Sequence, residues 1–225
     1  ISFGSYFIAE RYTYIPSIGL TIPLAWGICQ FKERVSTHFK IPLILLMTTI
    51  LLILHTLYVR QSKVWHDGVR LWSNVIQQFP HVEMAHSNRG NAYWKEENYV
   101  AALQDYSHAI ALNPQVYTTF SNRGAVYLRL GQPQLALADF NQAIKLNPRM
   151  AQAFNNRGSL FLETGQIESA IQDFTRSLEL QPHQIPALVN RANGYKQLGN
   201  NAKAREDINR ALQINPDFQR YKPQF

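Results

Sequence analysis

Hydrophobic residues follow two different patterns along this chain. Near the N-terminus they form uninterrupted runs, whereas beyond residue 82 small, aromatic and aliphatic residues return at regular intervals among polar ones. The run 41–59 contains no charged residue and lies between Lys40 and Arg60. As a helix rising about 1.5 Å per residue it would reach roughly 28 Å, close to the thickness of a hydrocarbon core. We therefore predict a transmembrane helix over 41–59.

A second apolar run, residues 12–31, is also uncharged. Proline and glycine interrupt it, and these residues kink a membrane helix or confine it to part of the bilayer. We predict a second transmembrane span here, with a re-entrant or interfacial segment as the alternative.

The loop 32–40 between the two runs carries Lys32, Arg34 and Lys40 against Glu33. The positive-inside rule places such a loop in the cytoplasm. The repeats that follow the second run are then expected on the non-cytoplasmic side.

From residue 83 onward the chain repeats itself every 34 residues without an insertion. The blocks are 83–116, 117–150, 151–184 and 185–218. Their eighth position is always small: Gly90, Gly124, Gly158 and Ala192. The twentieth is Ala102, Ala136, Ala170 and Ala204, and the twenty-fourth is Tyr106, Phe140, Phe174 and Ile208. This period predicts stacked antiparallel helix pairs, with the small residues where two helices cross.

The same period marks where the helices end. A proline follows the second helix of each block and stops it: Pro114, Pro148, Pro182 and Pro216. A glycine ends the first helix of three blocks, at Gly131, Gly165 and Gly199. The first block has Glu97 there, followed by Asn98.

This arrangement of small and aromatic positions resembles the tetratricopeptide repeat family over residues 83–218. The resemblance implies a right-handed α-solenoid of antiparallel helix pairs. Together with the two predicted transmembrane helices before it, this makes the expected fold all-α. We divide the chain into a membrane segment (1–62), a degenerate half-repeat (63–82), the four blocks and a tail (219–225).

The half-repeat 63–82 keeps part of the pattern. Gly68 takes the small twentieth position and Trp72 the aromatic twenty-fourth. We expect it to cap the stack and to join it rigidly to the last membrane helix. No polar closing helix follows Ile214, so either the repeats continue in a longer protein or this end binds another surface.

Arginine occupies the seventh position and aspartate the twenty-third position of every block. The pairs are Arg89 with Asp105, Arg123 with Asp139, Arg157 with Asp173, and Arg191 with Asp207. The two positions lie opposite each other in a hairpin that reverses near the fifteenth. We therefore expect structural ion pairs within or between repeats, with ligand binding by the arginines as the alternative.

Composition limits the chemistry. The net charge is +7, but the basic residues of the repeats are dispersed and interleaved with aspartate, which argues against nucleic-acid binding. The one cysteine, Cys29, forms neither a disulfide framework nor a thiolate metal site. His55 is interpreted as a packed or interfacial imidazole rather than a proton relay. We expect no metal, no cofactor and no complete active site in this chain.

Asparagine occupies the sixth position of every block: Asn88, Asn122, Asn156 and Asn190. Asn91 and Asn193 add amides at the ninth position. An amide both donates and accepts, so such a row suits an extended peptide; it resembles the asparagine ladder of some glycosyltransferase repeats. The alternative is that these amides satisfy local backbone groups. The fifth and ninth positions hold no lysine or arginine, so an acidic C-terminus is not the expected ligand.

Residues 10–17 read Glu-Arg-Tyr-Thr-Tyr-Ile-Pro-Ser. This motif, followed by two membrane runs and repeats, resembles the C-terminal part of the transmembrane-and-tetratricopeptide-repeat family of multi-span glycosyltransferases. The resemblance implies that Arg11 contacts the phosphate of a polyprenyl-phosphate sugar and that Tyr12 and Tyr14 line the lipid boundary. The alternative for Arg11 is helix-end anchoring. The acidic catalytic residue of such enzymes would lie outside this chain.

These features predict a membrane-anchored repeat protein whose groove binds a protein or an extended peptide. In the intact molecule the groove would present an acceptor polypeptide to a membrane-embedded sugar transferase. The competing prediction is a membrane-anchored scaffold without chemistry. A cytosolic chaperone adaptor is opposed by the run 41–59.

Overall fold

The computed structural model describes residues 42, 45–46, 48–56 and 67–216. The chain divides into two compact units, Ile1–Lys63 and Val64–Phe225. The predicted span 12–31, the loop 32–40 and the junction to the repeats lie outside the described residues, as does the tail 219–225.

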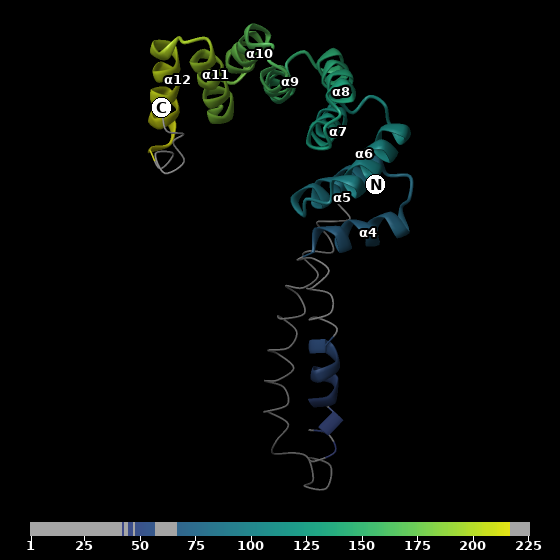
Figure 1. The fold of residues 1–225 in the computed structure, drawn as a ribbon. Helices are drawn as coiled ribbons and strands as arrows, with labels where there is room; N and C mark the ends of the chain where they lie inside the picture. Colours follow the sequence, from purple (N-terminus) through teal and green to yellow (C-terminus); the bar gives the residue numbers. More distant parts are fainter. Residues whose placement is uncertain (1–41, 43–44, 47, 57–66, 217–225) are drawn as a thin grey trace. The chain divides into compact units, whose positions relative to one another are not determined.

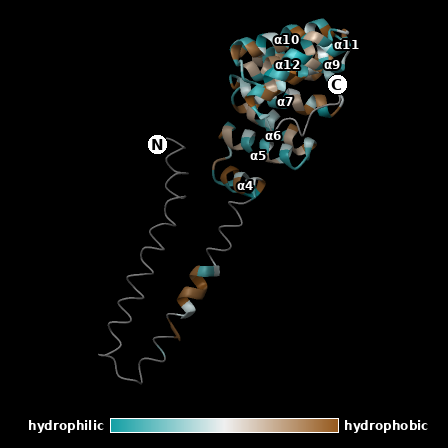
Figure 2. Ribbon diagram, turned by 90° about the vertical axis from the view of Figure 1, so that its left-hand side faces the viewer, coloured by the Kyte–Doolittle hydropathy of each residue, from teal (hydrophilic) through white to brown (hydrophobic). Residues whose placement is uncertain are grey.

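Within the first unit, residues 42, 45–46 and 48–56 are helical, and their side chains are exposed. Figure 2 shows this segment as mostly hydrophobic, in contrast to the mixed helices of the second unit. Among the residues that the structure describes, no helix is both long enough and apolar enough to cross a membrane.

The second unit is built from helices joined by short turns (Figure 1). The helices are α4 (Gly68–Gln78), α5 (Glu83–Lys95), α6 (Tyr99–Leu112), α7 (Tyr117–Arg129), α8 (Pro133–Leu146), α9 (Ala151–Glu163), α10 (Ile167–Leu180), α11 (Ile185–Gln197) and α12 (Asn201–Ile214). From α5 onward they pack as the hairpins α5–α6, α7–α8, α9–α10 and α11–α12. The predicted all-α solenoid of antiparallel pairs is confirmed.

The hairpins form two layers. The first helices α5, α7, α9 and α11 contact one another in succession, whereas the second helices do not touch each other within the described residues. When the helices of one layer lie closer together than those of the other layer, the stack curves toward the closely packed layer. The first helices therefore line the inner side of the arc that Figure 1 shows.

Glycine at the eighth position lets the two helices of a hairpin approach closely. A Cβ atom on Gly124 would lie 2.7 Å from a ring carbon of Phe140 and 3.2 Å from the carbonyl oxygen of Ala136. Gly90 and Gly158 face Tyr106 and Phe174 in the same way. In the fourth hairpin Ala192 packs against Ile208. The eighth residue is there larger than glycine, and the twenty-fourth is smaller than the aromatic residue of the other hairpins.

The turn between the helices of a hairpin requires a left-handed residue. Gly131, Gly165 and Gly199 adopt φ angles of 69°, 78° and 73°, as the sequence predicts. In the first hairpin Glu97 takes this conformation, with φ 58°. The backbone N–H of Asn98 closes that turn on the carbonyl of Tyr93 at 2.9 Å. The turn therefore occurs at the same position in all four hairpins.

Helix α4 packs against α5 and covers the first end of the stack. Gly68 allows this approach, because a Cβ there would lie 3.1 Å from Cβ of Ala92. Asp67 caps the helix by accepting a hydrogen bond from the N–H of Arg70. None of the residues of α4 is buried, as expected for a terminal element.

We predict that Glu97→Gly raises the free energy of unfolding by roughly 0.5–1 kcal/mol, because an L side chain is strained at positive φ. Glu96→Gly is the matched control, since Glu96 has φ −86° and loses the same charge. The control should lower stability by a similar amount. Urea unfolding followed by far-ultraviolet circular dichroism measures both, and equal effects of the two changes would contradict the prediction.

Candidate functional site

The arginine–aspartate pairs are two-pronged ion pairs within each hairpin. In the second hairpin, Nε and Nη2 of Arg123 donate to the two carboxylate oxygens of Asp139, each at 2.8 Å. The pairs Arg89–Asp105, Arg157–Asp173 and Arg191–Asp207 have the same geometry at 2.7–2.8 Å. The four aspartates are buried. Each pair therefore joins the first helix of a hairpin to its second helix.

Each arginine also reaches the preceding repeat, which the sequence reasoning missed. Nη1 of Arg123 donates to Oγ of Ser107 on α6 at 3.3 Å. The corresponding acceptors are Ser73 on α4, Asn141 on α8 and Thr175 on α10. All four acceptors occupy the twenty-fifth position of the preceding repeat, and this shared position could have revealed them. One guanidinium thus connects three helices.

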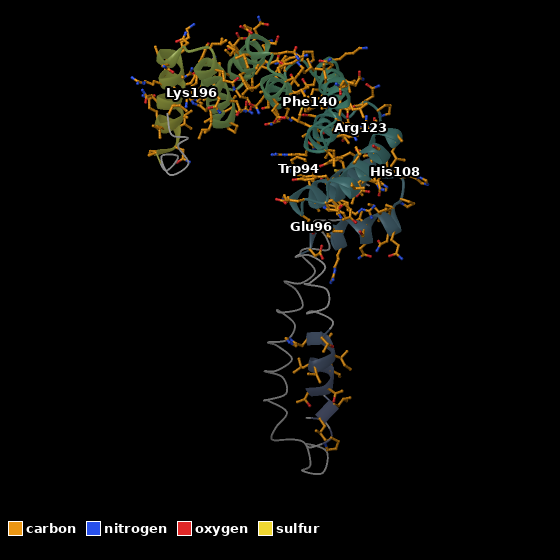
Figure 3. The ribbon with its side chains drawn as sticks, viewed as in Figure 1. Trp94, Glu96, His108, Arg123, Phe140 and Lys196 are labelled. Atoms are coloured by element: carbon orange, nitrogen blue, oxygen red, sulfur yellow. The ribbon has the colours of Figure 1, made fainter. Side chains whose placement is uncertain are left out.

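One or two aromatic rings lie beside the guanidinium of each of these arginines. The guanidinium carbon of Arg123 lies 5.7 Å from the ring centroid of Phe120 and 5.6 Å from that of Tyr127. The hydrogen bond to Asp139 raises the pKa of Arg123 above its ordinary value, against the opposing effect of burial. The guanidinium of Arg123 therefore stays charged at physiological pH. These contacts favour a structural role of the arginines over ligand binding. Arg123 and Phe140 are labelled in Figure 3.

The sixth-position asparagines of the second, third and fourth hairpins donate hydrogen bonds to the preceding repeat. Nδ2 of Asn122 donates to Oδ1 of Asn91 at 2.9 Å, and Nδ2 of Asn156 donates to Oγ of Ser121 at 3.1 Å. Asn190 donates to Oδ1 of Asn155 and to Oγ of Ser159, each at 3.2 Å. These amides donate to side chains on the first helix of the preceding hairpin, and not to backbone groups nearby in the sequence.

The first repeat adds a tyrosine to this network. The hydroxyl of Tyr106 donates to Oδ1 of Asn91 at 2.7 Å, and Nδ2 of Asn91 donates to Oδ1 of Asn88 at 3.5 Å. Burial raises the pKa of Tyr106, so its hydroxyl keeps its proton at physiological pH. Oδ1 of Asn91 therefore accepts two hydrogen bonds, one from Tyr106 and one from Asn122. The sequence signal for this hydrogen bond is the tyrosine at the twenty-fourth position of the first block, where the next two blocks have phenylalanine.

The second, sixth and ninth positions of the first helices lie on one helical face, because they are separated by four and three residues. The opposite face packs on the second helix through the fourth, eighth and eleventh positions. We call the former set the inner stripe: Met84, Asn88, Asn91, Thr118, Asn122, Ala125, Gln152, Asn156, Ser159, Pro186, Asn190 and Asn193. Its second-position residues are exposed, and its asparagines are half-buried. The inner stripe is the candidate binding surface.

Arg11, Tyr12 and Tyr14 lie outside the described residues. No group of three histidine, cysteine, aspartate or glutamate side chains in the described ranges could hold a metal ion.

Stacked helical hairpins with a polar inner face define a helical-repeat binding protein. Family models described as tetratricopeptide repeat match residues 56–116, 90–154, 151–184 and 185–218. The matched residues together extend over 56–218, and the chain belongs to the tetratricopeptide repeat family. No curated protein matches its sequence.

Solved structures share the fold. MamA 41-end from Desulfovibrio magneticus RS-1 is similar with a TM-score of 0.59 and 18% identity, and the match covers 75% of this chain and 97% of that chain. YrrB, described as a repeat protein with an unusual peptide-binding site, has a TM-score of 0.55 and 24% identity, covering 73% of this chain and 84% of YrrB. The first repeat domain of Spaghetti (RPAP3), bound to the HSP90 peptide SRMEEVD, has a TM-score of 0.51 and 27% identity, covering 52% of this chain and 94% of that domain.

We predict that Arg123→Ala lowers the free energy of unfolding by about 3–5 kcal/mol, because it leaves the buried carboxylate of Asp139 without its partner. Removing both groups, in Arg123→Ala with Asp139→Ala, should be less destabilising per group removed. Urea unfolding measures both variants. A variant that unfolds normally but no longer binds a partner would instead indicate a ligand-binding arginine.

Proposed function

We propose that the inner stripe binds an extended peptide or an extended segment of a partner protein. The observation that carries this proposal is the row of amides on α5, α7, α9 and α11, which recurs once per hairpin on one continuous layer. An extended peptide presents backbone N–H and C=O groups at regular intervals, and side-chain amides bind both. The peptide-bound repeat domain of RPAP3, at 27% identity, supports this use of the fold.

We predict that Asn122→Ala together with Asn156→Ala weakens binding of a partner peptide by about tenfold, since each amide lost removes roughly 0.5–1.5 kcal/mol of hydrogen bonding. Gln104→Ala with Gln172→Ala is the matched control, because both residues are exposed on second helices. The peptide is selected from a random library displayed against the chain. If the asparagine variant keeps its helicity and binds the peptide as tightly as the wild-type chain, the amide row is not the peptide-binding surface.

We further propose that the chain is anchored in a membrane through residues 41–59 and 12–31. Support comes from the uncharged run 41–59 and from its exposed, helical leucines, such as Leu52 at 64% exposure. The basic loop 32–40 supports a non-cytoplasmic location of the repeats.

We predict that the full chain floats with phospholipid vesicles in a density gradient and resists extraction by carbonate. Leu46→Lys with Leu52→Lys should abolish flotation, because a lysine at the centre of a span costs about 3 kcal/mol. Leu135→Lys, an exposed change on α8, is the control. A wild-type chain that stays in the aqueous fraction would contradict the anchor.

The anchor and the groove together are consistent with the C-terminal part of a polyprenyl-phosphate-sugar-dependent glycosyltransferase. In this proposal the groove delivers an acceptor polypeptide, while Arg11, Tyr12 and Tyr14 contact the lipid-linked sugar. The support is the motif at residues 10–17 and its position before the membrane runs. A non-enzymatic membrane-anchored scaffold uses the same groove and anchor. An acidic pair in an external loop preceding residue 1 would favour the enzyme.

A further inference from the structure

The second helices α6, α8 and α10 are each covered by the first helix of the following hairpin. Residues at the twenty-first, twenty-fifth and twenty-eighth positions of the second helix make this contact. On α10, Ile171 at the twenty-first position is so close to Gly194 of α11 that a Cβ there would lie 3.0 Å from its Cγ1. Thr175 at the twenty-fifth position accepts a hydrogen bond from Arg191 at 3.0 Å.

The twenty-eighth position sets the direction of the covering helix. On α10 it is Leu178, which is buried in one cluster with Ala187 of α11. The contacts therefore proceed from the third to the seventh and tenth positions of α11 while they proceed backward along α10. The two helices are antiparallel, in a register that these contacts define. The third position of the covering helix is small and fully buried in all four hairpins: Ala85, Thr119, Ala153 and Ala187.

The same three positions serve in the earlier repeats. The residues are Leu103, Ser107 and Ile110 on α6, and Leu137, Asn141 and Ile144 on α8. Each set consists of an aliphatic residue, a polar acceptor and a second aliphatic residue. This set is the surface on which a first helix packs.

Helix α12 presents these positions without a cover. Among the described helices it contacts α11 alone, and it lies at the end of the stack in Figure 1. Its residues at the three positions are Arg205, Asn209 and Leu212, which we call the α12 end face. Arg205 and Asn209 are exposed and Leu212 is half-buried, whereas Leu178 on α10 is only 5% exposed. The α12 end face keeps the polar acceptor and the second aliphatic residue.

The twenty-first position of α12 differs in character from the others. It is Arg205, where the three preceding second helices have leucine or isoleucine. A helix that covers α12 in the register of α11 places its tenth residue there. An aliphatic residue at that place would desolvate the guanidinium without giving it a partner, whereas a carboxylate would form charge-assisted hydrogen bonds with it.

The charge of α12 also favours an acidic partner. Its basic residues are Lys203, Arg205 and Arg210. Its acidic residues are Glu206 and Asp207, and the carboxylate of Asp207 is buried and bound by Arg191 of α11 at 2.7 Å. The solvent side of the helix therefore carries more positive than negative charge.

The sequence of residues 217–225 does not fit the covering role. In the repeat frame Pro223 takes the fifth position of a following block, where a first helix needs the backbone N–H that proline lacks. Arg220 and Lys222 also add positive charge, opposed by Asp217 alone. The carboxylate that complements Arg205 must therefore come from another protein.

We propose that the α12 end face binds an acidic amphipathic helix of a partner protein, antiparallel to α12. The partner helix carries a small residue, a hydrogen-bond donor four residues later and a carboxylate three residues after the donor. These spacings place all three on one helical face. The small residue packs on Leu212, the donor meets Oδ1 of Asn209, and the carboxylate meets Arg205. This surface belongs to a second helix and does not depend on peptide binding by the inner stripe.

The test uses the full chain in mild detergent and fluorescence anisotropy with three labelled helical probes. The first probe has the sequence of residues 184–197 with the change Gly194→Glu, and a staple on its opposite face holds it helical. Ala187 and Arg191 supply its small residue and its donor at the required spacing. The other two probes carry Gly194→Gln and Gly194→Lys.

We expect the glutamate probe to bind about tenfold more tightly than the lysine probe, with the glutamine probe between them, because one pair attracts and the other repels. Arg205→Glu should reverse this order. Lys203→Glu is the matched control, since it makes the same charge change on an exposed residue of α12 outside the end face, and it should keep the order. Far-ultraviolet circular dichroism checks that both variants fold.

Equal binding of the three probes, or no binding of any probe up to about 1 mM, would overturn the proposal. A variant Arg205→Glu that keeps the original order would do the same. If Lys203→Glu also reverses the order, the attraction is general to the charge of α12 and no docked helix is present. Peptides selected on the inner stripe should bind the wild-type chain and Arg205→Glu equally, so failure here leaves the proposed function in place.

Discussion

The structure depends on one guanidinium per repeat that holds three helices together. Arg123 binds Asp139 on its own second helix with two nitrogens and Ser107 on the preceding repeat with the third. The buried carboxylate of Asp139 needs a charged partner, and the arginine that supplies it joins the two helices of the hairpin and also contacts the preceding repeat. The same contact recurs in every hairpin of the stack.

The arginine–aspartate pairs use positions other than those of the inner stripe. In each hairpin an aspartate on the second helix binds the arginine of the first helix, and one or two aromatic rings lie beside the guanidinium. The inner stripe is left with neutral hydrogen-bonding groups, which are held in place by bonds between successive first helices.

Particular residues show how far sequence reasoning reached. Glycine at the eighth position and an aromatic at the twenty-fourth predict the helix crossing, and Gly124 under Phe140 confirms it. Glu97 was expected at the turn because of its place in the period, and it adopts the left-handed conformation there. The acceptor of each arginine in the preceding repeat was not foreseen, nor was the hydroxyl of Tyr106 on Asn91.

The sequence by itself determined the repeat, the helix ends and the pairing of arginine with aspartate within a hairpin. These features depend on residues that are close along the chain, where helical period and turn chemistry decide the geometry. Only the tertiary structure decided which neighbour each asparagine binds and which side chains share the inner stripe. Those contacts depend on the offset between successive hairpins, which arises from the packing of whole helices and not from any local pattern.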